Sequence, residues 1–188
     1  MKSAFQAAYS LIESRLQAGR QLAAALEGGA ASGKTTLARQ LALAFDAPVI
    51  PMDDFFLPPA LRTRERLQET GGNIHYERFE MQVAAPIREG SPIAYEVYDC
   101  HADRISGVRR IETAPLILIE GVYSLHPRYR DIYGLRLFLH TDQETQDARL
   151  RARGDWAYRM FQTAWLPMEK KYFDSEDWAA LCDITLDT

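Results

Sequence analysis

A glycine-rich segment at residues 28–36, GGAASGKTT, limits the possible folds of this chain more than any other feature. It matches the pattern of glycine, four residues, glycine, lysine and Ser/Thr, in which backbone N–H groups surround a phosphate. The small apolar run at residues 22–26 precedes it as a buried strand would, and residues 35–45 follow it as a helix would. The segment therefore predicts a strand, a phosphate-binding loop and a helix in succession. An ordinary turn between strand and helix is the alternative.

Each residue type in this loop has a physical role. Glycines let the backbone turn where side chains would clash, and the following helix directs the positive end of its dipole to the same point. We expect Lys34 to reach the β- and γ-phosphates of a nucleotide and the Thr35 hydroxyl to bind Mg²⁺. The predicted phosphate-binding residues include two arginines farther along the chain: Gly28, Gly29, Ala30, Ala31, Ser32, Gly33, Lys34, Thr35, Thr36, Arg149 and Arg153.

Composition predicts one globular domain over residues 1–188, because 47% of the residues are hydrophobic and 26% are charged. A net charge of −4 argues weakly against nucleic-acid binding, which needs a basic surface. We see no apolar run of about 18 residues and no signal-peptide core, so we expect no membrane contact and a cytoplasmic location. Cys100 and Cys182 are far apart and fit no metal-ligand spacing, so we expect reduced structural thiols.

Apolar runs alternate with helical patterns along the chain, which predicts an α/β fold with a parallel sheet of about five strands flanked by helices. The helix at residues 3–19 and a β-hairpin on the substrate side are additions to this alternation. A long polar stretch at residues 58–73 is interpreted as a substrate loop. The expected strands are 22–26, 47–52, 116–121, 135–139 and 184–186, the hairpin joins 93–98 to 108–111 across 104–107, and the remaining helices are 35–45, 76–89, 142–153 and 156–173.

Three acids follow predicted strands, at the edge where open α/β sheets bind ligands. Glu120 ends an apolar run and is the expected partner of Thr35 at Mg²⁺. Asp53 follows the second strand, and we expect it to act as the base that takes a proton from an attacking hydroxyl. Asp54 is the alternative base, although adjacent strand residues point to opposite faces, so only one of the two can face the site. Otherwise these acids face water or cap the following turn.

Basic residues gather at Arg149, Arg151 and Arg153, and Gly154 follows them as a plausible hinge. This pattern predicts a lid at about residues 149–158 that closes arginines over a transferring phosphate and excludes water. A solvated helix end is the alternative, and the spacing alone does not decide which arginine contacts phosphate.

Taken together, these residues resemble the uridine kinase / phosphoribulokinase group of P-loop kinases and are also similar to nicotinamide riboside kinases. The resemblance runs from about residue 22 to residue 187, and its carriers are segments 28–36, 52–58, 119–123 and 165–172. It implies a P-loop NTPase fold that uses ATP and Mg²⁺, with Asp53 as the catalytic base and Glu120 near the metal. The chain is shorter than typical uridine kinases, and residues 73–79 lack their usual His-Pro pairing.

The resemblance also implies an acceptor side. Residues 98–101 are similar to a segment that lines the nucleoside pocket of uridine kinases, although they could equally be solvent-facing hairpin residues. The substrate residues expected from this comparison are Asp54, Phe55, Tyr98, Asp99 and His101.

We therefore expect an ATP-dependent phosphotransferase, with Lys34 and Asp53 as catalytic residues, that phosphorylates a primary hydroxyl of a uridine- or cytidine-like small molecule. Alternative acceptors are ribosylnicotinamide, pantothenate and a sugar phosphate. The arginines at residues 62, 64 and 66 would suit an anionic acceptor, although a solvated face of the loop is the favoured interpretation. A nucleotide-binding regulatory ATPase is the alternative outside the kinases. The oligomeric state, including a homodimer, is left open.

Overall fold

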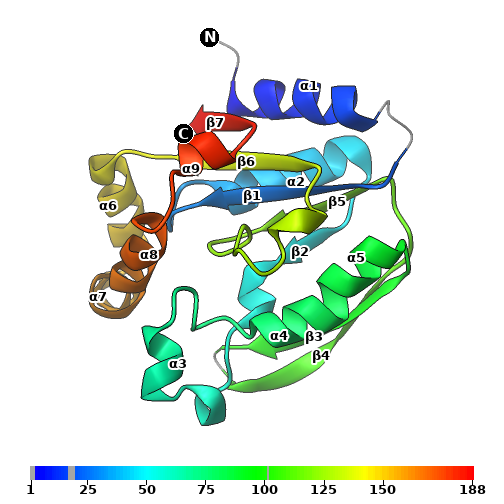
Figure 1. The fold of residues 1–188 in the computed structure, drawn as a ribbon. Coiled ribbons are helices and arrows are strands. Elements are labelled where there is room, and N and C mark those ends of the chain that lie inside the picture. Colours follow the sequence, from blue (N-terminus) through cyan, green and yellow to red (C-terminus); the bar gives the residue numbers. More distant parts are fainter. Residues whose placement is uncertain (1–2, 17–19, 101) are drawn as a thin grey trace.

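A computed structural model describes residues 3–16, 20–100 and 102–188. Within these residues, five parallel strands form the central sheet in the spatial order β2-β5-β1-β6-β7 (Figure 1). The strands are β1 (Leu22–Gly28), β2 (Val49–Pro51), β5 (Leu116–Glu120), β6 (Leu135–His140) and β7 (Ile184–Asp187). The expected α/β class with a parallel sheet is confirmed.

Both faces of this sheet are covered, which explains why its central strands are almost entirely apolar. Residues of β1 alternate between the two faces: Leu26 packs in the cluster under helices α1 (Ala4–Leu16) and α2 (Lys34–Phe45), whereas Ala25 packs in the cluster on the other side. The second cluster joins the sheet to the hairpin of β3 (Ile93–Asp99) and β4 (Arg104–Ile111) and to aromatic side chains near the C-terminus, including Tyr172. The sheet is thus a rigid, doubly covered platform whose strand ends remain free for a site.

The remaining helices lie away from α1 and α2, some beside the hairpin and others beyond the carboxyl ends of the strands (Figure 1). Two of the expected long helices, at 76–89 and 156–173, are present, but each contains a π-helical turn, Glu80–Ala84 and Phe161–Trp165 respectively. The bounds of the separate parts are α3 (Arg64–Gln68), α4 (Tyr76–Phe79), α5 (Ala85–Glu89), α6 (Gln143–Arg151), α7 (Asp155–Met160), α8 (Leu166–Phe173) and α9 (Trp178–Leu181). Of the helix expected at 3–19, residues 17–19 lie outside the described part.

The hairpin consists of antiparallel β3 (Ile93–Asp99) and β4 (Arg104–Ile111) (Figure 1). The turn expected at residues 104–107 is wrong, because those residues belong to β4 and the chain reverses between Asp99 and Arg104. Turn chemistry there explains the shift: the Asp99 carboxylate accepts a hydrogen bond from the N–H of Ala102 at 3.1 Å, and Asp103 adopts a left-handed backbone with φ of 48°.

The polar stretch at residues 58–73 is more ordered than a loop, since it contains α3 and a 3-10 turn, Pro59–Leu61. The hydroxyl of Thr63 caps α3 by accepting from the N–H of Arg66 at 3.1 Å. In the described part of the chain, every helix is too short or too polar to cross a bilayer.

Candidate active site

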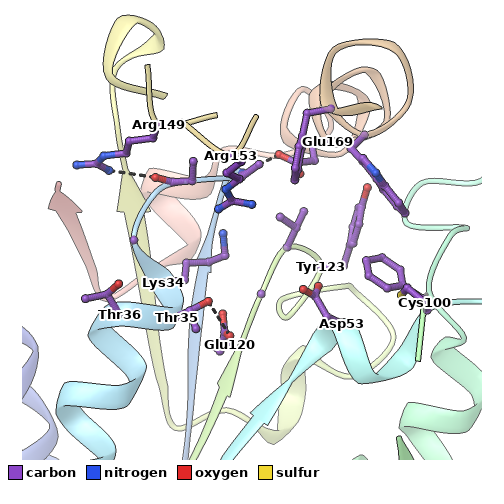
Figure 2. Close-up of a pocket in the computed structure, with 18 of the residues that line it drawn as sticks. Lys34, Thr35, Thr36, Asp53, Cys100, Glu120, Tyr123, Arg149, Arg153 and Glu169 are labelled. Carbon is purple, nitrogen blue, oxygen red and sulfur yellow. Dashed lines mark hydrogen bonds between the residues drawn. The ribbon is translucent and has the colours of Figure 1, made fainter. Parts of the chain in front are cut away.

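A cleft of about 1250 Å³ opens at the carboxyl ends of β1, β2 and β5. Its walls come from segments far apart in the sequence: the glycine-rich loop, the turn after β2, the end of β5, the end of β3 and the α6–α8 segment. Figure 2 shows loop residues on one side of this space, Asp53 on the other and Arg153 above Lys34. The structure therefore brings the two expected halves of the site together.

The glycine-rich loop has the backbone that anion binding requires. Three of its residues have positive φ, namely Gly28 at 149°, Ala31 at 59° and Gly33 at 86°. Gly33 immediately precedes α2 and supplies no side-chain cap, so the helix N-terminus is left to other partners. The Lys34 ammonium donates to the carbonyl of Gly29 at 2.7 Å. Burial lowers the pKa of Lys34, while Glu27 and three other carboxylates around it oppose that shift.

Thr35 and Glu120 meet as expected for a metal site. The Thr35 hydroxyl donates to Oε1 of Glu120 at 3.0 Å, and both side chains line the cleft. Burial raises the pKa of Glu120, and Lys34 and the Thr35 hydroxyl oppose that rise.

This donor set fits Mg²⁺ only if substrate oxygens complete it. Mg²⁺ is usually held by one or two carboxylates together with water and phosphate oxygens, and a threonine hydroxyl beside a carboxylate matches that chemistry. Among the residues that the structure describes, no group of three or more His, Cys, Asp or Glu could hold a metal ion. A magnesium ion at this position would therefore depend on the phosphates of a bound nucleotide.

Asp53 and Asp54 face different surroundings, although not for the expected reason. They lie in a 3-10 turn, Met52–Phe55, rather than in a strand, and the turn still directs them apart. Asp53 lines the cleft and is open to its solvent, yet the nearby walls remove enough hydration to raise the pKa of its carboxyl, against the opposing charge of Lys34. Asp53 thus occupies the position expected for the base.

The side chain of Asp54 instead contacts the hairpin. Its carboxylate accepts a hydrogen bond from the Tyr95 hydroxyl at 3.1 Å and pairs with Arg109 at 3.1 Å, and only 8% of the residue is exposed. Phe55 is fully buried and stacks on Tyr95. The structure therefore places these two predicted substrate residues in the core beside the cleft. Phe56 is the neighbouring residue that lines it.

Two of the other predicted substrate residues line the cleft. Tyr98 and Asp99 do so from the end of β3, and the Tyr98 hydroxyl donates to Asp103 at 2.6 Å. Burial is the main cause that raises the pKa of Tyr98 to about 12. The remaining prediction, His101, lies outside the described residues. Cys100, which we expected to be structural, is an exposed free thiol at the cleft wall.

The structure gives the three arginines different surroundings, and the two predicted to bind phosphate, Arg149 and Arg153, line the cleft. Arg149 donates to the carbonyl of Ala31 at 3.0 Å, and Arg153 lines the cleft with its guanidinium over the ring of Phe161 (Figure 2). Arg151 points elsewhere, because it pairs with Asp147 at 2.6 Å. Arg149 and Arg151 are two apart on α6 and so differ in direction by more than half a turn, whereas Arg153 lies beyond the end of this helix.

Sequence reasoning missed Glu27, the buried acid under the loop. Its carboxylate accepts hydrogen bonds from the N–H groups of Gly28 and Leu125 at 2.9 and 3.0 Å and from the Tyr172 hydroxyl at 2.9 Å. Burial raises the pKa of Glu27 to about 7, and these donors oppose the rise. Glu27 connects the loop to α8 and to the segment after β5. A carboxylate at the end of an otherwise apolar strand was the available signal.

Three further cleft residues were also missed: Tyr123 after β5, Trp165 just before α8 and Glu169 in α8. Trp165 packs against Phe56 with ring centroids 5.1 Å apart, which gives the cleft an aromatic wall. Tyr123 lines the cleft from a left-handed backbone with φ of 74°, a strained conformation for a bulky residue. Glu169 accepts a hydrogen bond from the N–H of Ala30 at 2.8 Å.

The sheet order, the positive-φ loop before α2 and the Thr35–Glu120 pair define a P-loop NTPase fold of the type found in P-loop kinases. No family model matches the chain. A solved structure of a possible uridine kinase from Bacillus stearothermophilus is similar with a TM-score of 0.69 and 20% identity, covering 94% of this chain and 97% of that one. A Silicibacter protein provisionally assigned as a fructose transport system kinase has a TM-score of 0.73 and 23% identity, with the same coverage of both chains. These likenesses support the fold.

Two relatives found by sequence similarity have names that point to uridine kinase-like proteins among the P-loop kinases. Uridine kinase-like protein 4 from Arabidopsis thaliana is 28% identical over 130 residues, 65% of this chain. Uridine-cytidine kinase-like 1 from Mus musculus is 25% identical over 155 residues, 76% of this chain. The chain spans 28% of the length of each of these two relatives. Together the comparisons support a uridine kinase-like P-loop kinase family for this chain.

Proposed function

We propose that the protein is an ATP-dependent phosphotransferase that phosphorylates a primary hydroxyl of a nucleoside-like small molecule of the uridine or cytidine type. One observation carries the proposal: a phosphate-binding loop and the carboxylate of Asp53 face each other across one cleft. A protein that only binds a nucleotide needs the loop, whereas a transferase also needs a group that positions the acceptor hydroxyl.

On the donor side, the loop amides and Lys34 would hold the phosphates, and Thr35 and Glu120 would hold Mg²⁺. Bound there, Mg²⁺ would neutralise charge on the phosphates. Arg153 lines the cleft as the cation that would stabilise charge on the transferred group. We infer that residues 149–158 act as a lid, since this segment carries both cleft-facing arginines.

On the acceptor side, Asp53 would accept the proton of the attacking hydroxyl. Its raised pKa leaves it a stronger base than a fully hydrated aspartate, which suits that role. Phe56 and Trp165 supply an aromatic surface near it, and planar rings stack well on such surfaces.

Charge in this half of the cleft favours an uncharged acceptor over a sugar phosphate. Asp53 and Asp99 line it, whereas the arginines at residues 62, 64 and 66 are not among its lining residues. Arg62 donates to the carbonyl of Leu57 at 2.7 Å, and Arg66 forms a two-pronged pair with Glu77 at 2.7 and 2.9 Å. Uridine and cytidine are uncharged and carry a planar ring, so they suit both the charge and the aromatic surface of this half of the cleft. Ribosylnicotinamide, pantothenate and an uncharged sugar such as fructose remain the other acceptors to compare.

The test is ATP consumption with a panel of uridine, cytidine, ribosylnicotinamide, pantothenate, fructose, fructose phosphate and no acceptor, with the products identified by mass. We expect consumption to require an acceptor and a pyrimidine nucleoside to gain one phosphate group. ATP hydrolysis at the same rate with and without every acceptor would contradict the proposal and favour a regulatory ATPase.

A further inference from the structure

A carboxylate occupies part of the phosphate loop in this structure. Oε2 of Glu169, on α8, accepts a hydrogen bond from the N–H of Ala30 at 2.8 Å, and the side chain lines the cleft near Arg153 (Figure 2). Only 8% of Glu169 is exposed. The loop therefore already holds an anionic oxygen on one of the amides that its sequence pattern assigns to phosphate.

The same stretch of the loop is also held by side chains of α6. Gln146 donates to the carbonyl of Ala30 at 2.9 Å, and Arg149 donates to the carbonyl of Ala31 at 3.0 Å. Ala31 has the left-handed backbone that a non-glycine residue rarely adopts without support. Glu169 holds the N–H of Ala30 while α6 holds the two carbonyls, and together these hydrogen bonds keep the loop in its curved conformation.

The hydrogen bond of Glu169 supports the loop, but its negative charge would oppose the binding of phosphate there. Lys34 is buried among carboxylates, with Glu27, Glu169, Glu120 and Asp53 all acting on it. Because this end of the cleft is weakly hydrated, two negative charges brought close together repel each other strongly. The phosphates of an incoming nucleotide would meet the Glu169 carboxylate at the loop.

We propose that Glu169 is a positioning residue with two separable effects: its hydrogen bond holds the phosphate loop in shape, and its charge competes with the nucleotide phosphates. The inference rests on the proposed function, since it takes a nucleoside triphosphate as the ligand of this loop. The chain offers a substitution that divides the two effects. Glu169→Gln keeps an oxygen that can accept from the Ala30 N–H and removes the charge, whereas Glu169→Ala removes both.

The experiment measures the affinities of the full-length protein and its variants for adenosine, ADP and ATP by titration calorimetry. Glu169→Gln is expected to bind ATP about tenfold more tightly than the wild type, ADP less so and adenosine with no change, because the effect grows with phosphate charge. Glu169→Ala is expected to gain less for ATP than Glu169→Gln. Asp174→Asn, an exposed acid just beyond α8 that pairs with Lys170 at 2.6 Å, is the matched control and should change none of the three.

An equal gain for adenosine and ATP, or no gain in Glu169→Gln, would overturn the competition. An equal gain in Glu169→Ala and Glu169→Gln would overturn the positioning effect. If the wild type binds ATP and Glu169→Gln binds it with the same affinity, this inference is overturned and the proposed function is not. Folded wild type and Glu169→Gln that both fail to bind any nucleotide would overturn the proposed function and this inference together.

Discussion

Thr35 and Glu120 are 85 positions apart in the sequence, and a 3.0 Å hydrogen bond joins them in the wall of the cleft. The bond links the first turn of α2 to the last residue of β5, both of which are fixed by the core. The hydroxyl and the carboxylate that we propose as Mg²⁺ ligands are consequently held close together by the fold, which would reduce the reorganisation that metal binding requires.

The first prediction concerns this pair. Glu120→Gln keeps an oxygen that can accept from Thr35 but removes the negative charge, so we expect the Mg²⁺ concentration needed for half-maximal activity to rise by about 10- to 100-fold. Mg²⁺ titrations of the phosphotransfer rate measure this. Thr35→Ser keeps the hydroxyl and serves as the control, with a small change expected. An unchanged Mg²⁺ requirement in Glu120→Gln would remove Glu120 from the metal site.

The second prediction separates the arginines near the proposed lid. Arg153→Gln should lower kcat by about 100-fold, because it removes a cation that would act on the transferring phosphate. Arg151→Gln should leave kcat within about twofold, since Arg151 pairs with Asp147 and Tyr158 away from the cleft. Steady-state kinetics of the two variants provide the comparison. Equal losses in both would mean that the segment acts through its fold rather than through Arg153.

The third prediction concerns pH and the buried Glu27. Its pKa rises from 4.5 to about 7 on folding, so the folded state retains a proton that the unfolded state has lost over this interval. Relative to Glu27→Gln, the wild type should therefore lose about 3 kcal/mol of stability as the pH rises from about 4.5 to 7, with little further change in the difference above that range. Urea unfolding of the wild type and Glu27→Gln across these pH values measures it. Parallel stability curves would contradict the assigned pKa.

Local sequence patterns were enough to predict most of the fold and the donor half of the site. The loop at residues 28–36, the apolar run ending at Glu120 and the acid after β2 could be predicted because each depends on neighbouring residues and on the general rule for strand ends. The position of Asp53 followed from that rule even though the strand ended one residue earlier than expected.

The rest depended on contacts between distant segments. Glu169 meets Ala30 across 139 positions, and Tyr172 meets Glu27 across 145, so no periodicity in the sequence could reveal either contact. The wrong hairpin turn had a local cause: Gly107 suggested a turn, while Asp99 and Asp103 supplied the actual one. Phe55 resembled a substrate residue because the sequence does not show which of two adjacent phenylalanines the core will take.

The central claim is that Asp53 positions the acceptor for transfer from a nucleotide held in the loop. It is tested most directly by measuring kcat of Asp53→Asn beside its affinity for ATP, using the acceptor selected by the panel. We predict a fall in kcat of at least about 100-fold with ATP affinity within a few-fold of the wild type. Asp54→Asn, one position away but paired with Arg109, should keep turnover and lose thermal stability. Normal turnover by Asp53→Asn would contradict the account.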